Sequence, residues 1–180
     1  MLVIKNANPE SISTDGQFLV VTIDADVFMF NTQTKDLIPI TKTPQLAEFH
    51  VSISPDRSLM TYTRNDSRAY HVFLQHARLG SNLVQISDME GAEEPRWTAD
   101  GKRIIYRSGQ QWMEVEIKNA ETLEVGKPKL ITEGDYINID GFSFDISRDG
   151  QKLLLVKGSE QKSSSEIRTI KNWFKELTSG

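Results

Sequence analysis

A short motif that recurs four times along the 180 residues constrains the fold more than any other feature of this sequence. Each copy places an aspartate in a polar turn, a hydroxyl residue two positions before it, and a large apolar residue three positions before it. An apolar segment follows each turn. The aspartates are Asp15, Asp56, Asp100 and Asp149, the hydroxyl residues are Ser13, Ser54, Thr98 and Ser147, and the apolar residues are Ile12, Ile53, Trp97 and Ile146. Two short strands joined by a tight turn have this pattern.

The four turns are separated by 41, 44 and 49 residues. A period of roughly 40–45 residues that is rich in short strands is typical of β-propeller blades. A second pattern repeats independently, because the outer strands of three units end in Ile40-Thr41, Ile86-Ser87 and Ile131-Thr132. We therefore predict one all-β domain over residues 1–180, a β-propeller of four four-stranded blades. Their approximate bounds are 7–42, 43–88, 89–133 and 134–180, and residues 119–127 are expected to form a polar loop.

The fourth unit has no outer strand of its own, whereas Leu2-Val3-Ile4 is an apolar triplet that belongs to no unit. Residues 1–6 are therefore predicted to supply the closing strand. Pairing of the two chain ends within one chain gives a closed four-bladed ring without exposed edges. Pairing between two copies instead gives an eight-bladed dimer. Both alternatives remain open at this point.

Composition excludes several classes of function. The apolar fraction of 38% is ordinary for a globular domain, and a net charge of −4 argues against nucleic acid as a partner. The absence of cysteine excludes disulfides, thiolate catalysis and cysteine-bound zinc. No apolar run approaches the roughly 18 residues of a membrane span, so we expect no membrane insertion. The N-terminus lacks the pattern of an export signal, which favours the cytoplasm for the chain as written and the periplasm if its N-terminus is truncated.

Two segments, Trp97–Tyr106 and Ile53–Asp56, resemble the TolB-type propeller repeat. The segment Ile167–Leu177 resembles the ending of bacterial TolB-like propeller proteins. The same repeat occurs in propeller domains of prolyl-oligopeptidase-like enzymes and in oligogalacturonate lyases. The resemblance implies a fold rather than a reaction, because the repeat builds blades and carries no chemistry. The chain departs from such propellers in having four units, where they usually have six or more.

Motifs for catalysis are sparse. The four turn aspartates are predicted to be structural, because an aspartate in this place accepts hydrogen bonds from its own turn while glycine supplies the positive φ. The chain contains no Gly-x-Ser-x-Gly elbow and no phosphate-binding loop, so neither a serine hydrolase nor a cofactor is expected.

The three histidines, His50, His71 and His76, all fall in the second unit. Oligogalacturonate lyases bind manganese through a histidine-rich channel, which makes His50 and His71 weak candidates for metal ligands. A lyase-like enzyme is therefore the alternative function. We expect no metal, because the other three units offer no histidine to such a channel.

The loops between second and third strands and the loops between blades share one face of a propeller, here called the mouth. Acidic residues gather there, so we predict a non-catalytic scaffold that binds a protein or peptide. A homodimer that completes the ring is a further expected partner, and a C-terminal fragment of a larger propeller or peptidase-type protein is another alternative. The candidate binding residues of the mouth are Asp24, Asp26, Asp66, Arg68, Glu90, Glu93, Glu94, Asp135 and Asp140.

Overall fold

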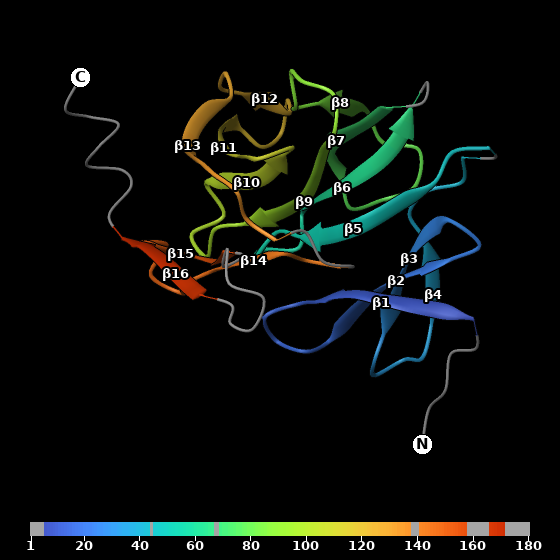
Figure 1. Ribbon diagram of the computed structural model, residues 1–180. Helices are drawn as coiled ribbons and strands as arrows, with labels where there is room; N and C mark the ends of the chain where they lie inside the picture. Colours follow the sequence, from blue (N-terminus) through green and yellow to red (C-terminus); the bar gives the residue numbers. More distant parts are fainter. Residues whose placement is uncertain (1–5, 44, 67–68, 138–140, 158–165, 172–180) are drawn as a thin grey trace.

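The computed structural model describes residues 6–43, 45–66, 69–137, 141–157 and 166–171, the last range by its backbone alone. The described residues form antiparallel sheets joined by turns, which confirms the predicted all-β class. The four sheets follow one another in chain order and are numbered I to IV; they begin at residues 7, 48, 92 and 144. Figure 1 shows sheet I at the lower right, sheets II and III above it, and sheet IV at the lower left. No helix of the described residues is long and apolar enough to cross a membrane.

Each sheet lies within one of the four predicted repeat units. Sheet I contains β1 (Ala7–Ile12), β2 (Phe18–Ile23), β3 (Asp26–Asn31) and β4 (Leu37–Pro39). Sheet II contains β5 (Glu48–Ile53), β6 (Leu59–Asp66), β7 (Ala69–His76) and β8 (Leu83–Gln85). Sheet III contains β9 (Ala92–Trp97), β10 (Arg103–Ser108), β11 (Gln111–Asn119), β12 (Glu124–Val125) and β13 (Lys129–Glu133). Sheet IV contains β14 (Phe144–Ile146), β15 (Lys152–Lys157) and β16 (Glu166–Lys171).

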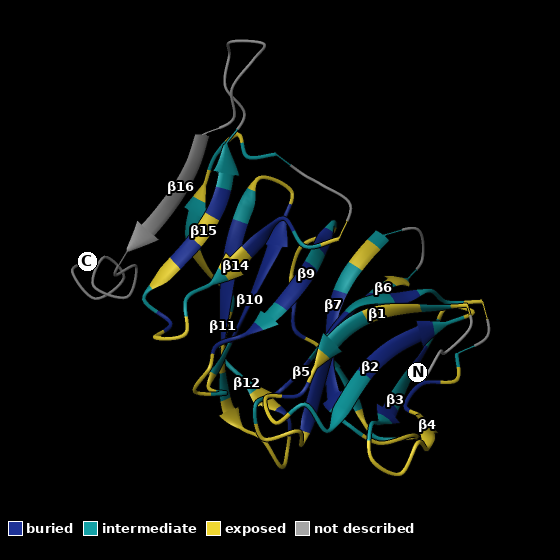
Figure 2. Ribbon diagram, turned by 90° about the horizontal axis from the view of Figure 1, so that it is seen from below, coloured by how far each residue is buried: buried dark blue, intermediate teal, exposed yellow. Residues whose placement is uncertain are grey.

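Three apolar clusters join neighbouring sheets. Val20 and Val27 of sheet I pack with Val51, Ile53 and Met60 of sheet II. The other two clusters join sheets II and III around Leu74, Trp97 and Ile104, and sheets III and IV around Trp112, Phe144 and Leu153. Figure 2 shows these buried residues concentrated where the sheets face one another. Full burial of such a side chain contributes about 1.5–3 kcal/mol, so the repeated packing of sheet on sheet is the main source of stability.

The four aspartate turns share one hydrogen-bond pattern. In each, an aspartate oxygen accepts from the hydroxyl two residues before it and from the backbone N–H two residues after it, at 2.5–3.1 Å. The residue that follows the aspartate has a φ between 65° and 70°, whether it is Gly16, Arg57, Gly101 or Gly150. Neighbouring turns also touch, since Arg57 forms a 2.7 Å ion pair with Asp15. Each aspartate thus accepts hydrogen bonds within its own turn, as expected for structural residues.

The prediction that the outer strands end in the repeated pairs is wrong for the first two units, and Ile131-Thr132 lies within β13. Strand β4 ends at Pro39 and β8 at Gln85, before the repeated Ile-Thr and Ile-Ser pairs. There the hydroxyl of Thr41 accepts a 2.8 Å hydrogen bond from the Val27 N–H. The hydroxyl of Ser87 accepts one of 3.1 Å from the Val72 N–H. A side-chain oxygen thus satisfies the ladder donor just beyond the end of the strand.

The prediction of a loop over residues 119–127 is wrong in part. The chain reverses through Leu123, which has a φ of 58°, and β12 then pairs with the end of β11. Leu123 is buried in the cluster between sheets II and III and Val125 packs against it, so two apolar residues anchor this mostly polar segment.

The predicted closing strand, Leu2-Val3-Ile4, lies outside the described residues, as does the end of the tail beyond Lys171. Among the described residues no apolar cluster joins sheet I to sheet IV, and the four sheets form an arc in which these two are the ends.

Candidate binding mouth

The inner strands of the first three sheets carry a bulge. The pairing register shifts between Pro9 and Ser11 in β1, between Phe49 and Ser52 in β5, and at the corresponding place between β9 and β10. His50 and Glu94 occupy these bulges with φ values of 52° and 59°. Each stands three residues before the apolar residue of its repeat. A bulge re-aims side chains, so these two positions project differently from a regular strand.

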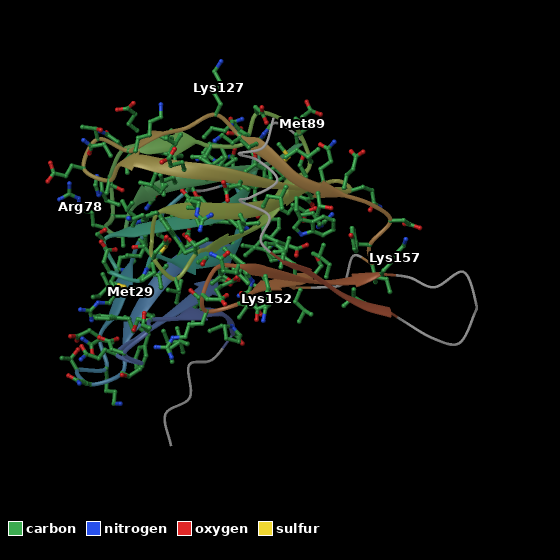
Figure 3. The ribbon with its side chains drawn as sticks, turned by 90° about the vertical axis from the view of Figure 1, so that its left-hand side faces the viewer. Met29, Arg78, Met89, Lys127, Lys152 and Lys157 are labelled. Carbon is green, nitrogen blue, oxygen red and sulfur yellow. The ribbon has the colours of Figure 1, made fainter. Side chains whose placement is uncertain are left out.

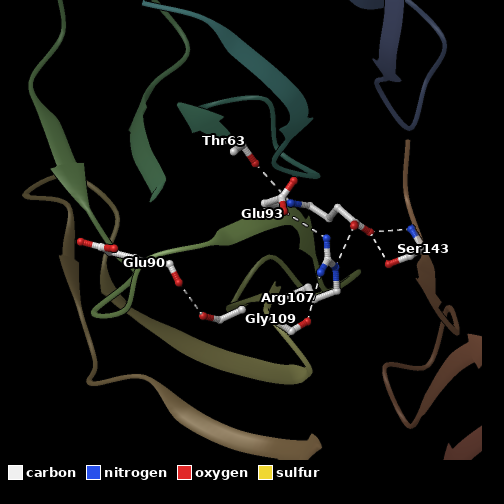
Figure 4. Close-up of polar contacts among 8 residues, drawn as sticks. Thr63, Glu90, Glu93, Arg107, Gly109 and Ser143 are labelled. Carbon is white, nitrogen blue, oxygen red and sulfur yellow. Dashed lines mark hydrogen bonds and ion pairs between the residues drawn. The ribbon is translucent and has the colours of Figure 1, made fainter. Parts of the chain in front are cut away.

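Glu94 lies at the centre of a buried polar network (Figure 4). Its carboxylate accepts from the Arg107 Nε at 2.9 Å and from the N–H and Oγ of Ser143 at 2.5 and 2.6 Å. Arg107 also contacts Glu93 at 3.1 Å and donates to the carbonyl oxygen of Gly109 at 3.0 Å. The Glu94 side chain is 1% exposed and that of Arg107 8% exposed. Glu94 therefore links sheet III to the chain entering sheet IV, and one arginine faces two carboxylates.

His50 lies beside this network in an aromatic setting. Its ring centroid is 4.9 Å from that of Phe49 and 5.3 Å from that of Phe142, and the Arg96 guanidinium lies 4.0 Å above the Phe142 ring. Among the described residues the buried His50 Nδ1 has no hydrogen-bond partner. Burial lowers the pKa of His50, although the charge of Glu94 opposes that shift. Burial and the charges of Arg107 and Arg96 thus favour the neutral imidazole.

The other histidines lie in separate surroundings. His71 pairs with Arg64 across the sheet, and its Nδ1 lies 3.2 Å from the Gln85 Nε2. His76 lies 3.2 Å from the carbonyl oxygen of Glu121. The structure thus brings His50 together with glutamate and aromatic residues rather than with His71. The part of the chain that the structure describes holds no group of three or more histidine, aspartate or glutamate side chains suited to a metal ion.

The seven predicted mouth residues that the structure describes fall into three groups. Asp24, Glu90 and Asp135 are exposed. Asp26 accepts a hydrogen bond from the Thr43 N–H at 3.0 Å, and Asp66 forms a 2.6 Å ion pair with Arg64. Glu93 and Glu94, in contrast, are turned into the Arg107 network instead of lying open at the surface. Burial raises the pKa of Glu93, against the effect of the Arg107 charge. Arg68 and Asp140 lie outside the described residues.

Sequence reasoning missed the carboxylates that hold the inner strands together. Glu10 accepts from the Val51 N–H at 3.0 Å, so it caps the bulge of the next sheet much as Glu94 caps Ser143. Glu48 is fully buried and accepts from the hydroxyls of Thr41 and Thr43, each at 2.6 Å. Burial raises the pKa of both Glu10 and Glu48. A signal was present in each case, because these acidic residues lie in inner strands that continue into apolar positions.

Three described arginines near the mouth end are paired. Arg64 contacts Asp66, Arg96 contacts Asp145 at 3.6 Å, and Arg107 contacts Glu93 and Glu94. At the rim, Asp24, Glu90 and Asp135 are exposed on three loops, and Lys42 is exposed in the loop between β4 and β5. Exposed carboxylates of this kind attract cationic groups.

No family model and no curated protein sequence matches the chain. Solved structures do match its fold. TolB from Acinetobacter baumannii superposes with a TM-score of 0.66 at 18% identity, over 92% of this chain and 40% of that one. Dipeptidyl peptidase 4 from Porphyromonas gingivalis gives 0.62 at 11% identity, over 96% and 32%. Hydrazine synthase from Kuenenia stuttgartiensis gives 0.54 at 18% identity, over 79% and 47%.

The chain thus spans less than half the length of each of these structures, and their low identities bear on the fold alone. They include both TolB and enzymes, so the likeness does not separate a binding module from a catalytic one. The repeat, the four antiparallel sheets and the superposition on TolB agree with one another. The fold of this chain is a TolB-like β-propeller fold.

Proposed function

We propose that this chain is a non-catalytic propeller module that binds a basic protein or peptide segment at its mouth. The observation that carries the proposal is the difference between the two ends of the sheets. At the turn end, the aspartates are occupied by their own turns. At the mouth end, the described Arg64 and Arg107 are paired, while Asp24, Glu90 and Asp135 stay exposed on three separate loops.

The geometry of the mouth supports binding of an extended partner. Its exposed carboxylates lie in the β2–β3 turn, in the loop before β9 and in the loop after β13, so they surround the inner strands of successive sheets. Beneath them the Arg107 network and the Glu10 and Glu48 contacts hold the inner strands in place. A rigid base with charged loops above it is suited to recognition, because little conformational entropy is lost on binding.

The test uses a lysine-rich peptide and isothermal titration calorimetry. The triple variant Asp24→Asn/Glu90→Gln/Asp135→Asn is expected to bind the peptide more weakly, with a flatter dependence of affinity on salt concentration, because its exposed charges are lost. The matched control, Asp36→Asn/Glu121→Gln/Glu124→Gln, removes three exposed carboxylates at the turn end, two in loops and one in β12, and is expected to bind as the wild type does. Equal weakening by both variants, or an unchanged affinity in the mouth variant, would contradict the proposal.

A further inference from the structure

Because the four sheets share one repeat, the exposure of equivalent residues can be compared to find which face of each sheet is covered by a neighbour. In sheets II and III, the apolar residue three positions before the turn aspartate faces the preceding sheet. Ile53 is 7% exposed against sheet I and Trp97 is 9% exposed against sheet II, where its Nε1 donates to the Ser52 carbonyl oxygen at 3.1 Å. The equivalent residue of sheet I, Ile12, is 61% exposed. Sheets II and III each bury this face against the sheet before them. Among the described residues, no sheet covers the equivalent face of sheet I.

This face is apolar across the whole sheet. The register places Ile12, Leu19, Phe30 and Leu37 in one row from β1 to β4. Leu37, at the far end of the row, is 42% exposed. Its counterpart in sheet II, Leu83, packs against the cluster between sheets I and II. Both ends of the row in sheet I therefore carry residues whose counterparts in sheet II are packed against a neighbour.

The opposite end of the arc shows the complementary face. In each sheet, one residue of the second strand pairs with the residue just before the apolar residue of the repeat, and it faces the following sheet. These four residues are Val20, Thr61, Ile105 and Leu154. The first three are 0% exposed, whereas Leu154 of sheet IV is 43% exposed. It lines a hollow of about 240 Å³ together with Ile146 and Lys152. Figure 3 shows this end of the arc, with Lys152 labelled at the start of β15.

The two exposed residues are counterparts. Within the chain, Val20 and Ile53 share the cluster between sheets I and II, and Ile105 and Ile146 share the cluster between sheets III and IV. If another sheet followed sheet IV in the same way, its equivalent of Ile53 would pack on Leu154. Ile12 of sheet I is the residue equivalent to Ile53, so the Ile12 face matches the Leu154 face. Each chain has one face of each kind and, among the described residues, no apolar cluster that joins them.

We propose that a second copy of this chain covers both faces, with Ile12 of each copy packed on Leu154 of the other. Each junction joins two different faces, and two copies related by a two-fold axis satisfy both junctions at once and close the ring. A second copy fits better than an unrelated partner, because it presents the same repeat whose packing already forms three junctions in the chain. Packing of the two faces on each other also covers Ile12, Leu37 and Leu154, which are 42–61% exposed in the single chain.

Multi-angle light scattering during size-exclusion chromatography tests the dimer. The wild-type protein is expected at twice the 20.4 kDa of one chain. Ile12→Asp and Leu154→Lys are each expected to give single chains, because each places a charge against an apolar face at both junctions. Met89→Asp changes an equally exposed apolar residue in the loop between β8 and β9, away from sheet IV in Figure 3, and is expected to stay dimeric.

Mixing the two charged variants gives the sharper result. In a mixed dimer, the introduced aspartate of one copy meets the introduced lysine of the other at one junction. The second junction keeps the native Ile12 and Leu154, so equimolar mixing is expected to restore the dimer mass. A symmetric contact of Ile12 with itself predicts no such rescue. A wild-type mass of one chain, or dimers that survive both substitutions, would overturn the proposal.

Cross-linking keeps the proposal testable if a charged variant fails to fold. The chain has no cysteine, so Ile12→Cys and Leu154→Cys introduce the only thiols. A mixture of the two single variants is expected to form a covalent dimer under oxidation. The double variant is expected to give dimers too, whereas a linked single chain from it would overturn the proposal by showing that the two faces close within one chain.

Discussion

Replacement of Glu94 by alanine tests whether the polar network beneath the mouth holds the inner strands together. The substitution removes the acceptor of three hydrogen bonds, one from the Arg107 guanidinium and two from Ser143. It also leaves a guanidinium that is 8% exposed with one carboxylate fewer. Loss of one partner of a buried pair typically costs about 3–5 kcal/mol, whereas a surface pair contributes about 0–1 kcal/mol.

Arg107 keeps its contacts with Glu93 and with the Gly109 carbonyl oxygen, so we expect the lower end, about 3 kcal/mol, for Glu94→Ala. Glu94→Gln keeps the shape of the side chain but turns an amide N–H₂ toward either Arg107 or Ser143, both of which are donors. A buried donor left unsatisfied costs about 1–3 kcal/mol, so the glutamine variant should be intermediate or close to alanine.

Urea unfolding followed by circular dichroism measures both effects, provided that the wild type unfolds in one transition. The double variant Glu94→Leu/Arg107→Met removes both charges and is expected to recover much of the loss, since apolar replacement of a buried pair is often neutral. A loss below about 1 kcal/mol for Glu94→Ala would refute the reasoning and place Glu94 in effective contact with water.

The remaining predictions concern the turns and the sheet contacts. Gly101→Val should lower the free energy of unfolding by about 1 kcal/mol or more, because a β-branched residue resists a φ of 68° beside Pro55, and Gly101→Asn, which tolerates that φ, should cost less; equal thermal stability of the two variants would contradict it. The Ser54 hydrogen bond lowers the pKa of Asp56 below that of the unfolded chain, so its stabilisation is complete above a pH of about 3.9 and is lost as the pH falls through the folded pKa. Asp56→Asn should therefore flatten acid unfolding below that pH, and an unchanged acid profile would argue against this. Trp97→Phe should cost about 0.5–1.5 kcal/mol in urea unfolding, because it removes the donor to Ser52; no change would show that the contact is not stabilising.

The sequence was most informative where chemistry and position repeat together. The aspartate turns could be predicted because a side-chain acceptor, a hydroxyl donor and a positive-φ residue must lie close in sequence to form one turn. The pairs Ile40-Thr41 and Ile86-Ser87 were predicted to end the outer strands, whereas they lie just beyond β4 and β8 and act as side-chain acceptors for the ladder. That role depends on the partner strand, which lies 14 or 15 residues away.

The contacts of the mouth were beyond sequence reasoning because they join residues far apart in the chain. Glu94 and Ser143 are 49 residues apart, and a single pattern of acidic loops does not reveal which carboxylate turns inward. His50 and His71 were considered as metal ligands because both fall in the second unit. The bulge at His50, which places its ring beside Phe142, could not be predicted from that shared position.

We propose that the mouth end binds a partner, whereas the turn end builds the sheets. Hydrogen exchange with and without the lysine-rich peptide tests this difference, since it reports protection for each backbone segment. We expect new protection around residues 24–26, 88–92 and 133–137, and none in the turns at 13–17, 54–58 and 98–102. Protection confined to the turns would contradict it.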